Sequence, residues 1–252
     1  MCVILYKPIG KKLPNTKVLK QCFDTNSHGA GYMLPINNNV VIRKGFMKFE
    51  DFKNDIMKTF SDYNLDIEKT PVVIHFRIST QGGTQPELCH PYPICRDYNE
   101  MRLLNTECKM ALAHNGIISR CSTSEYSLGH WDEKLKTWVN GAKRKLDYND
   151  TMTFIKDYAS LVIDNDTYFA RNPSKCELLE QLCEYGKLAI MNNKGFVKLI
   201  GQFYEKDGIY YSNLYSFDEP KKQKLPKGSR FLTSRDFDDD DDYYSYLSRQ
   251  DM

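Results

Sequence analysis

The 252-residue sequence contains no long apolar run. No stretch approaches the roughly 18 residues that a membrane-spanning helix needs. No basic segment leads into an apolar stretch at the N-terminus, as it does in a secretory signal. The charge is also nearly balanced, with 35 Lys and Arg against 33 Asp and Glu. Because a net charge of +2 attracts anionic surfaces only weakly, we expect a cytoplasmic protein that binds neither a membrane nor nucleic acid.

Signatures of metal and nucleotide binding are missing too. The closest group of potential zinc ligands, Cys89 and Cys95 with His90 between them, has the wrong spacing for zinc and lacks a second ligand pair. The sequence has neither the glycine fingerprint of a dinucleotide site nor a phosphate-binding loop. We therefore expect no metal and no cofactor, and we expect the eight cysteines to be reduced thiols.

Hydrophobic residues make up 41% of the sequence and charged residues 27%, which is typical of a globular protein. Hydrophobic periodicity separates strands from helices. The predicted strands cover 3–6, 28–34, 40–46, 71–79 and 109–118, and the predicted helices cover 49–63, 150–163 and 174–186. We expect Asp150 to be the N-cap of its helix. In the last helix we expect Ser174 and Glu177 to form a capping box and Gly186 to be the C-cap.

Three further strands are predicted at 187–192, 196–204 and 209–217, joined by glycine-containing turns into one meander. Strands at both ends with helices between and after them indicate an α+β fold, in which stacked sheets are covered by helices. We expect one domain over residues 2–217. Residues 218–252 are charged and contain a run of aspartates, so we expect a disordered tail there.

Four short stretches carry residues that could perform chemistry. Removal of the initiator methionine would give Cys2 a thiol and a free α-amine on one residue. Arg77 lies on a strand and, facing inward, needs an anionic partner such as a substrate carboxylate. Asn115 and Gly116 follow a strand, where a side-chain amide and a backbone N–H can together hold an oxyanion. Asp150 opens a helix and could bind an ammonium group.

Each of these residues also has a purely structural interpretation when it is taken alone. The cysteine could be a core residue, and the arginine could belong to a structural salt bridge. Asn-Gly is a common tight-turn dipeptide, and an aspartate at a helix start is a common N-cap. Only the combination of the four stretches, in this order, separates the functional interpretation from the structural one.

In that order the stretches resemble the class II glutamine amidotransferase domain, a member of the N-terminal nucleophile hydrolases. The matching segments are Cys2, HFRISTQG at 75–82, HPY at 90–92, HNGI at 114–117 and NDT at 149–151. They span about residues 2–165, and the ordered set is far more specific than any single segment.

The resemblance implies a four-layer αββα sandwich of two stacked, mainly antiparallel sheets flanked by helices. It also implies an enzyme that hydrolyses the amide of glutamine through a thioester on Cys2 and releases ammonia and glutamate. The implied catalytic residues are Cys2, Asn115 and Gly116, and the implied substrate-binding residues are Arg77, Thr80 and Asp150. Arg77 would pair with the substrate α-carboxylate, and Asp150 would pair with the α-ammonium.

Members of this family usually carry a second domain that consumes the ammonia, but only about 35 residues follow residue 217. We therefore expect a separate ammonia-accepting enzyme as partner; such short stand-alone forms resemble those in bacteriophage genomes. Two alternatives remain open. His28 stands where the family often has an acid, which would fit a pocket for another amide, such as a γ-glutamyl conjugate. In a non-catalytic binding protein on the same scaffold, the basic residues 143–145 and the acidic tail would be contact surfaces.

Overall fold

The computed structural model describes residues 2–79, 83–121, 130–139 and 147–217. All four ranges belong to one unit, Met1–Phe217. The predicted tail, 218–252, and the basic residues 143–145 lie outside the described residues. In the described ranges, no helix combines the length and the apolar character that are needed to cross a bilayer.

A seven-stranded sheet has the strand order β12-β13-β1-β4-β2-β3-β6, and neighbouring strands are antiparallel. Its strands are β1 (Val3–Lys7), β2 (Ala30–Ile36), β3 (Asn39–Phe46), β4 (Val72–Phe76), β6 (Asn105–Cys108), β12 (Tyr204–Lys206) and β13 (Ile209–Tyr211). The N-terminal strand β1 is therefore internal, with β13 on one side and β4 on the other.

A second, four-stranded antiparallel sheet has the order β11-β10-β7-β5. Its strands are β5 (Tyr92–Pro93), β7 (Met110–Asn115), β10 (Lys187–Asn192) and β11 (Val197–Ile200). A separate hairpin pairs β8 (His130–Asp132) with β9 (Thr137–Val139). This hairpin lies between the predicted strand at 109–118 and the predicted helix at 150–163, where the sequence analysis predicted neither a strand nor a helix.

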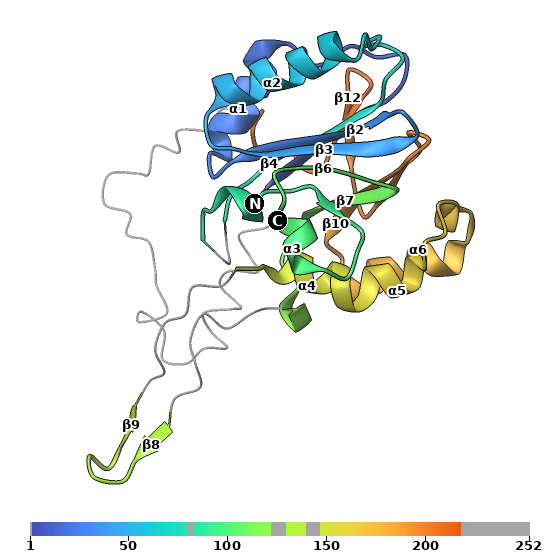
Figure 1. The fold of residues 1–252 in the computed structure, drawn as a ribbon. Helices are drawn as coiled ribbons and strands as arrows, with labels where there is room; N and C mark the ends of the chain where they lie inside the picture. The colour runs from blue at the N-terminus through green and yellow to red at the C-terminus, as the bar shows by residue number, and fades with distance from the viewer. Residues whose placement is uncertain (1, 80–82, 122–129, 140–146, 218–252) are drawn as a thin grey trace, which may run out of the picture. The chain divides into compact units, whose positions relative to one another are not determined.

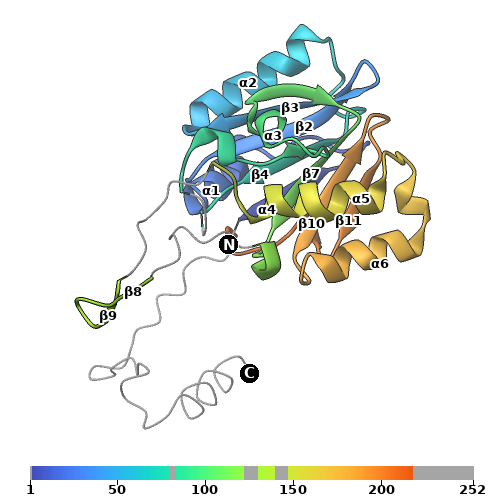
Figure 2. The same ribbon diagram turned by 60° about the horizontal axis from the view of Figure 1, so that its bottom comes forward.

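Helices cover the outer face of each sheet. The seven-stranded sheet carries α1 (Thr16–Thr25) and α2 (Phe49–Asp62) (Figure 1). The four-stranded sheet carries α4 (Asp150–Phe154), the π-helical turn η3 (Ile155–Ala159), α5 (Ser160–Ile163) and α6 (Pro173–Leu182) (Figure 2). The short helices are α3 (Tyr98–Arg102) and the 3₁₀ turns η1 (Pro86–Leu88), η2 (Ser119–Cys121) and η4 (Phe169–Arg171).

Three hydrophobic layers fill the spaces between these elements. Because side chains alternate along a strand, Val3 and Leu5 of β1 pack toward α1 and α2, whereas Ile4 packs between the sheets. The layer between the sheets contains the small residues Ala113 and Ala189. The α+β fold with two stacked antiparallel sheets is thus confirmed, and its order of layers is helix, sheet, sheet, helix.

The prediction of one C-terminal meander is wrong. Strands β10 and β11 belong to the four-stranded sheet, whereas β12 and β13 belong to the seven-stranded sheet. The chain changes sheets just after β11, where Gly201 has φ +81°. A Cβ on Gly201 would lie 2.8 Å from the carbonyl oxygen of Gly186, so only glycine fits this crossing without a shift. Turn signals in the sequence do not show which sheet the next strand joins.

The predicted helix caps are also wrong in detail. Asn149 is the N-cap of α4 and accepts from Met152 N, so Asp150 is the first helical residue and not the cap. Asn172 caps α6 (Pro173–Leu182) and Cys183 is its C-cap, so the predicted capping box and the glycine C-cap are absent from that described helix. Helix α1, which the sequence did not predict, is capped by Asn15.

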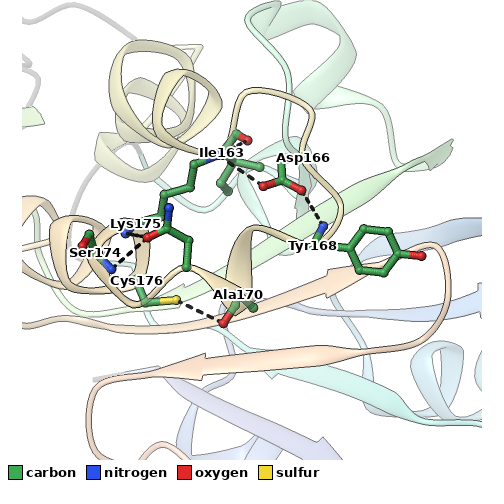
Figure 3. A network of polar contacts seen from close by, with 8 residues as sticks. Ile163, Asp166, Tyr168, Ala170, Ser174, Lys175 and Cys176 are labelled. Carbon is green, nitrogen blue, oxygen red and sulfur yellow. Dashed lines mark hydrogen bonds and ion pairs between the residues drawn. The ribbon is translucent and has the colours of Figure 1, made fainter.

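A polar network fixes the connection between α5 and α6 (Figure 3). Lys175 Nζ donates to Ile163 O and to Asp166 Oδ2, each over 3.3 Å. The other oxygen of Asp166 accepts from Tyr168 N at 2.9 Å. Lys175, in the first turn of α6, thus connects that helix to the end of α5, and both helices stay packed on the four-stranded sheet.

Candidate active site

One small cavity gathers residues from separate segments of the chain. Its lining residues are Cys2, Arg77, Ile78, His90, His114, Gly116, Asn149, Asp150 and Thr151. The cavity measures about 20 Å³, which is room for about one water molecule. Four of the six predicted site residues, Cys2, Arg77, Gly116 and Asp150, therefore share one cavity. Asn115 is not part of its lining, and Thr80 lies outside the described residues.

Cys2 lies directly before β1. Because Val3 pairs with Phe76 across the β1–β4 ladder, the cysteine sits beside the two residues that follow β4. Its Sγ accepts from Ile78 N and donates to Ile78 O, each over 3.3 Å. Burial raises the pKa of the thiol, while the Ile78 N–H and the charge of Arg77 act in the opposite direction. The protonated thiol is therefore favoured, and a reaction at this sulfur needs a base.

Arg77 organises the chain after β4. Its guanidinium donates to Gly83 O (2.7 Å) and Ser79 Oγ (3.1 Å), and its backbone N donates to Gly29 O (2.8 Å). His28 N donates to Arg77 O, and His28 Nδ1 accepts from Ser79 N at 2.9 Å. His28 therefore helps to shape the loop that carries Arg77.

Asn115 ends β7 and Gly116 follows it. Asn115 Nδ2 donates to Ser212 Oγ at 2.8 Å, whereas its buried Oδ1 has no hydrogen-bond partner among the described residues. A Cβ on Gly116 would lie 2.8 Å from His114 Nε2 and 3.1 Å from the Cα of Gly186. The lack of a side chain at Gly116 therefore allows its backbone to lie close to His114 and Gly186.

Asp150 is held at the start of α4 by two backbone N–H groups. Its Oδ2 accepts from Ile118 N and its Oδ1 accepts from Thr151 N, each over 2.9 Å. The neighbouring cap Asn149 also donates to Tyr92 Oη at 2.8 Å. Because an ionised carboxylate has about four acceptor sites, Asp150 can link the loop after Gly116 to α4 and still accept from a bound cation.

Sequence reasoning used three histidines only as motif markers, but they form a buried group at this site. The ring of His90 lies 4.3 Å from that of His75 and 6.4 Å from that of His114. Burial lowers the pKa of His75 to about 3 and that of His114 to about 4, and it holds the pKa of His90 well below its usual value. All three imidazoles are therefore neutral at pH 7.

Contacts of the histidines fix part of this group. His75 Nε2 lies 3.1 Å from His114 O, and because a carbonyl only accepts, this nitrogen carries the proton. His114 Nδ1 lies 2.9 Å from Thr151 Oγ1. The alternation of the strand that contains His75 was the available signal, because it placed this imidazole on the opposite face from Val72 and Ile74.

Two further residues were missed because they follow β13, far along the chain. Ser212 contacts Asn115, and Asn213 Nδ2 donates to Cys2 O at 2.6 Å. Within the described ranges, no three His, Cys, Asp or Glu side chains are grouped as a metal site would require.

A scan against models of known protein families finds no match for the chain, and a search of curated proteins finds none either. The chemistry of the cavity therefore has to follow from its own residues.

Proposed function

We propose that the chain is a cysteine-type N-terminal nucleophile amidohydrolase that cleaves the side-chain amide of glutamine. The supporting observation is the shared cavity, which Cys2, Arg77, Gly116 and Asp150 line together. A thiol can attack the amide carbon, a backbone N–H can bind the oxyanion, and a cation and an anion can bind the two charged groups of an amino acid. The motifs that carry the resemblance to class II glutamine amidotransferases supply all four.

The proposed base is the α-amine of Cys2, which becomes free when Met1 is removed. Burial raises the pKa of the thiol, so the thiol does not ionise unaided at neutral pH. An α-amine, with a pKa of about 7.7–8, can take the thiol proton directly or through a water molecule. The sulfur then bonds to the amide carbon of glutamine, and the carbonyl oxygen becomes an oxyanion.

The oxyanion collapses, the carbon–nitrogen bond breaks, and the departing nitrogen takes a proton and leaves as ammonia. Water then cleaves the thioester, which yields glutamate and restores the thiol. Gly116 N–H and the Asn115 amide are the proposed oxyanion donors, and loss of one such donor typically costs about 3–4 kcal/mol of transition-state stabilisation. Arg77 and Asp150 hold the α-carboxylate and the α-ammonium, away from the reacting bond.

A bound glutamine is larger than one water molecule, so the cavity has to widen when substrate enters. We infer that the substrate α-carboxylate replaces Gly83 O and Ser79 Oγ as the partners of the Arg77 guanidinium. Such an exchange keeps the buried charge satisfied in both states. No metal or organic cofactor enters this scheme.

The proposed setting is the cytoplasm, where thiols stay reduced; each cysteine of the chain is free in the structure. We propose that the ammonia is consumed by a separate enzyme. A γ-glutamyl conjugate is the alternative substrate, because it shares the α-carboxylate and the α-ammonium that Arg77 and Asp150 would recognise.

Intact-mass measurement before and after treatment with a diazo-ketone analogue of glutamine tests the proposal. We expect loss of one methionine and then a single adduct, which is absent in Cys2→Ala. Cys95→Ala is the matched control, because Cys95 is also a half-buried free cysteine, and it should keep the adduct. A processed protein without an adduct would move the proposal to another amide. A retained methionine would remove the base, and the non-catalytic alternative would then be preferred.

A further inference from the structure

Ser212 contacts two parts of the proposed active site: the strand that follows Cys2, and Asn115. Its side chain is fully buried, with 0% exposed. Its Oγ accepts from Ile4 N at 2.8 Å and lies 2.8 Å from Asn115 Nδ2. Ile4 belongs to the strand that follows the nucleophile, in the seven-stranded sheet, whereas Asn115 ends a strand of the other sheet. One hydroxyl therefore links the strand of Cys2 to the proposed oxyanion donor.

Neighbouring contacts hold Ser212 in place. Its backbone N donates to Ile4 O at 2.9 Å, so the pairing between β1 and β13 continues past the end of β13. Asn213 then binds Cys2 O, and Lys187 Nζ of β10 donates to Ser212 O. Because the backbone is held from both sheets, the position of the hydroxyl is set before any substrate binds.

The contact with Ser212 affects which way the side-chain amide of Asn115 faces. With Nδ2 on Ser212, the buried acceptor Oδ1 is left without a partner among the described residues, and the serine hydrogen has no acceptor there. A serine hydroxyl both donates and accepts. If the side-chain amide of Asn115 rotated by 180°, the Ser212 hydroxyl would donate to Asn115 Oδ1. The Ser212 oxygen would still accept from Ile4 N, and both hydrogens of Asn115 Nδ2 would be available to an oxyanion.

We propose that Ser212 is a positioning residue that receives Asn115 Oδ1 during the reaction and so directs Nδ2 to the oxyanion. This inference rests on the proposed amidohydrolase function. The hydroxyl, and not the volume of the side chain, is what the role requires. Ser212 acts through Asn115 and does not itself contact the substrate, so its loss should lower kcat and leave KM nearly unchanged.

The test compares Ser212→Thr with Ser212→Val in the full chain. The two side chains have nearly the same shape, and only threonine keeps the hydroxyl, so both carry the same crowding in a buried site. Glutamate release from glutamine gives kcat and KM, and thermal unfolding shows that both variants fold. We expect Ser212→Val to have a kcat about 10²-fold below that of Ser212→Thr, with KM values within about threefold. Ser216→Ala, at a serine only 2% exposed in the same segment, should keep the wild-type kcat.

A double-mutant cycle isolates the route through Asn115. We expect Ser212→Ala to lower kcat in the wild-type background and to have no further effect in Asn115→Ala, because the group that it positions is gone. Equal kcat values for the Thr and Val variants, or fully additive losses in the cycle, would overturn the role of Ser212 alone. A wild-type protein that releases no glutamate would overturn the proposed function, and this inference with it.

Discussion

The buried neutral histidines should make the folded protein less stable in acid, because they bind protons more weakly in the folded chain than in the unfolded chain. In the unfolded chain a histidine titrates near pH 6.5, whereas burial lowers the pKa of His75 to about 3 and that of His114 to about 4. Between these values the unfolded chain binds protons that the folded chain does not. The stabilisation is therefore complete above pH 6.5 and is lost as the pH falls toward 4 and 3.

The size of the effect can be worked out for a fall from pH 7 to pH 5. One pKa unit corresponds to about 1.4 kcal/mol, so each of the two histidines should remove about 2 kcal/mol from the free energy of unfolding. These two histidines together remove about 4 kcal/mol, and His90, whose pKa burial also holds well below its usual value, adds to the loss. The sum is large against the 5–15 kcal/mol that is typical of folded domains. The charge of Arg77 reinforces the shift at His75, whereas Asp150 opposes the shift at His114.

Urea unfolding at pH 7, 6 and 5, followed by circular dichroism, measures this loss. Replacement of His114 by Gln keeps a polar side chain that does not titrate, so the variant should lose about 2 kcal/mol less than the wild type between pH 7 and 5. The comparison uses each protein's own change with pH and is independent of the variant's starting stability. An equal change in both proteins would refute the assignment of a neutral, buried imidazole at His114.

Two further predictions concern the walls of the cavity. Gly116→Ala places a methyl group against His114 Nε2, so we expect thermal unfolding to show a loss of about 1–3 kcal/mol from overpacking; an unchanged melting temperature would contradict the close approach. Asn149→Ala removes a buried cap that also binds Tyr92 Oη, and we expect urea unfolding to show a loss of about 2–3 kcal/mol. Asn172→Ala removes an exposed cap and should cost about 1 kcal/mol; equal losses would argue against the buried contact.

Local patterns were sufficient to predict most strands and helices of the compact unit. Side chains alternate along a strand, so the strand predicted at 71–79 has Val72 and Ile74 on one face and Val73 on the other. The structure packs the first face against the helices and the second against the other sheet. The partition of the C-terminal strands between two sheets was not predictable in this way. A turn such as that after β11 looks the same in sequence whether the next strand stays in the sheet or leaves it.

The candidate site, too, was predictable from the sequence only in part. Ordered motifs selected Cys2, Arg77, Gly116 and Asp150, which line one cavity. Ser212 was missed because its partners Ile4 and Asn115 are 208 and 97 positions away in the sequence. A buried serine has no periodicity of its own, so only the folded chain reveals which groups it contacts.

The internal position of β1 has a consequence for the order of events during synthesis. Its neighbour β4 is complete at residue 76, but its other neighbour, β13, ends at residue 211. At about 5–20 residues per second, the ribosome needs roughly 7–27 seconds to make the intervening chain. Until then neither Ser212 nor Asn213 exists to hold the residues around Cys2, so an aminopeptidase meets an N-terminus that lacks these two contacts. If β1 pairs with both neighbours while Met1 is still attached, the proposed nucleophile Cys2 keeps a blocked α-amine.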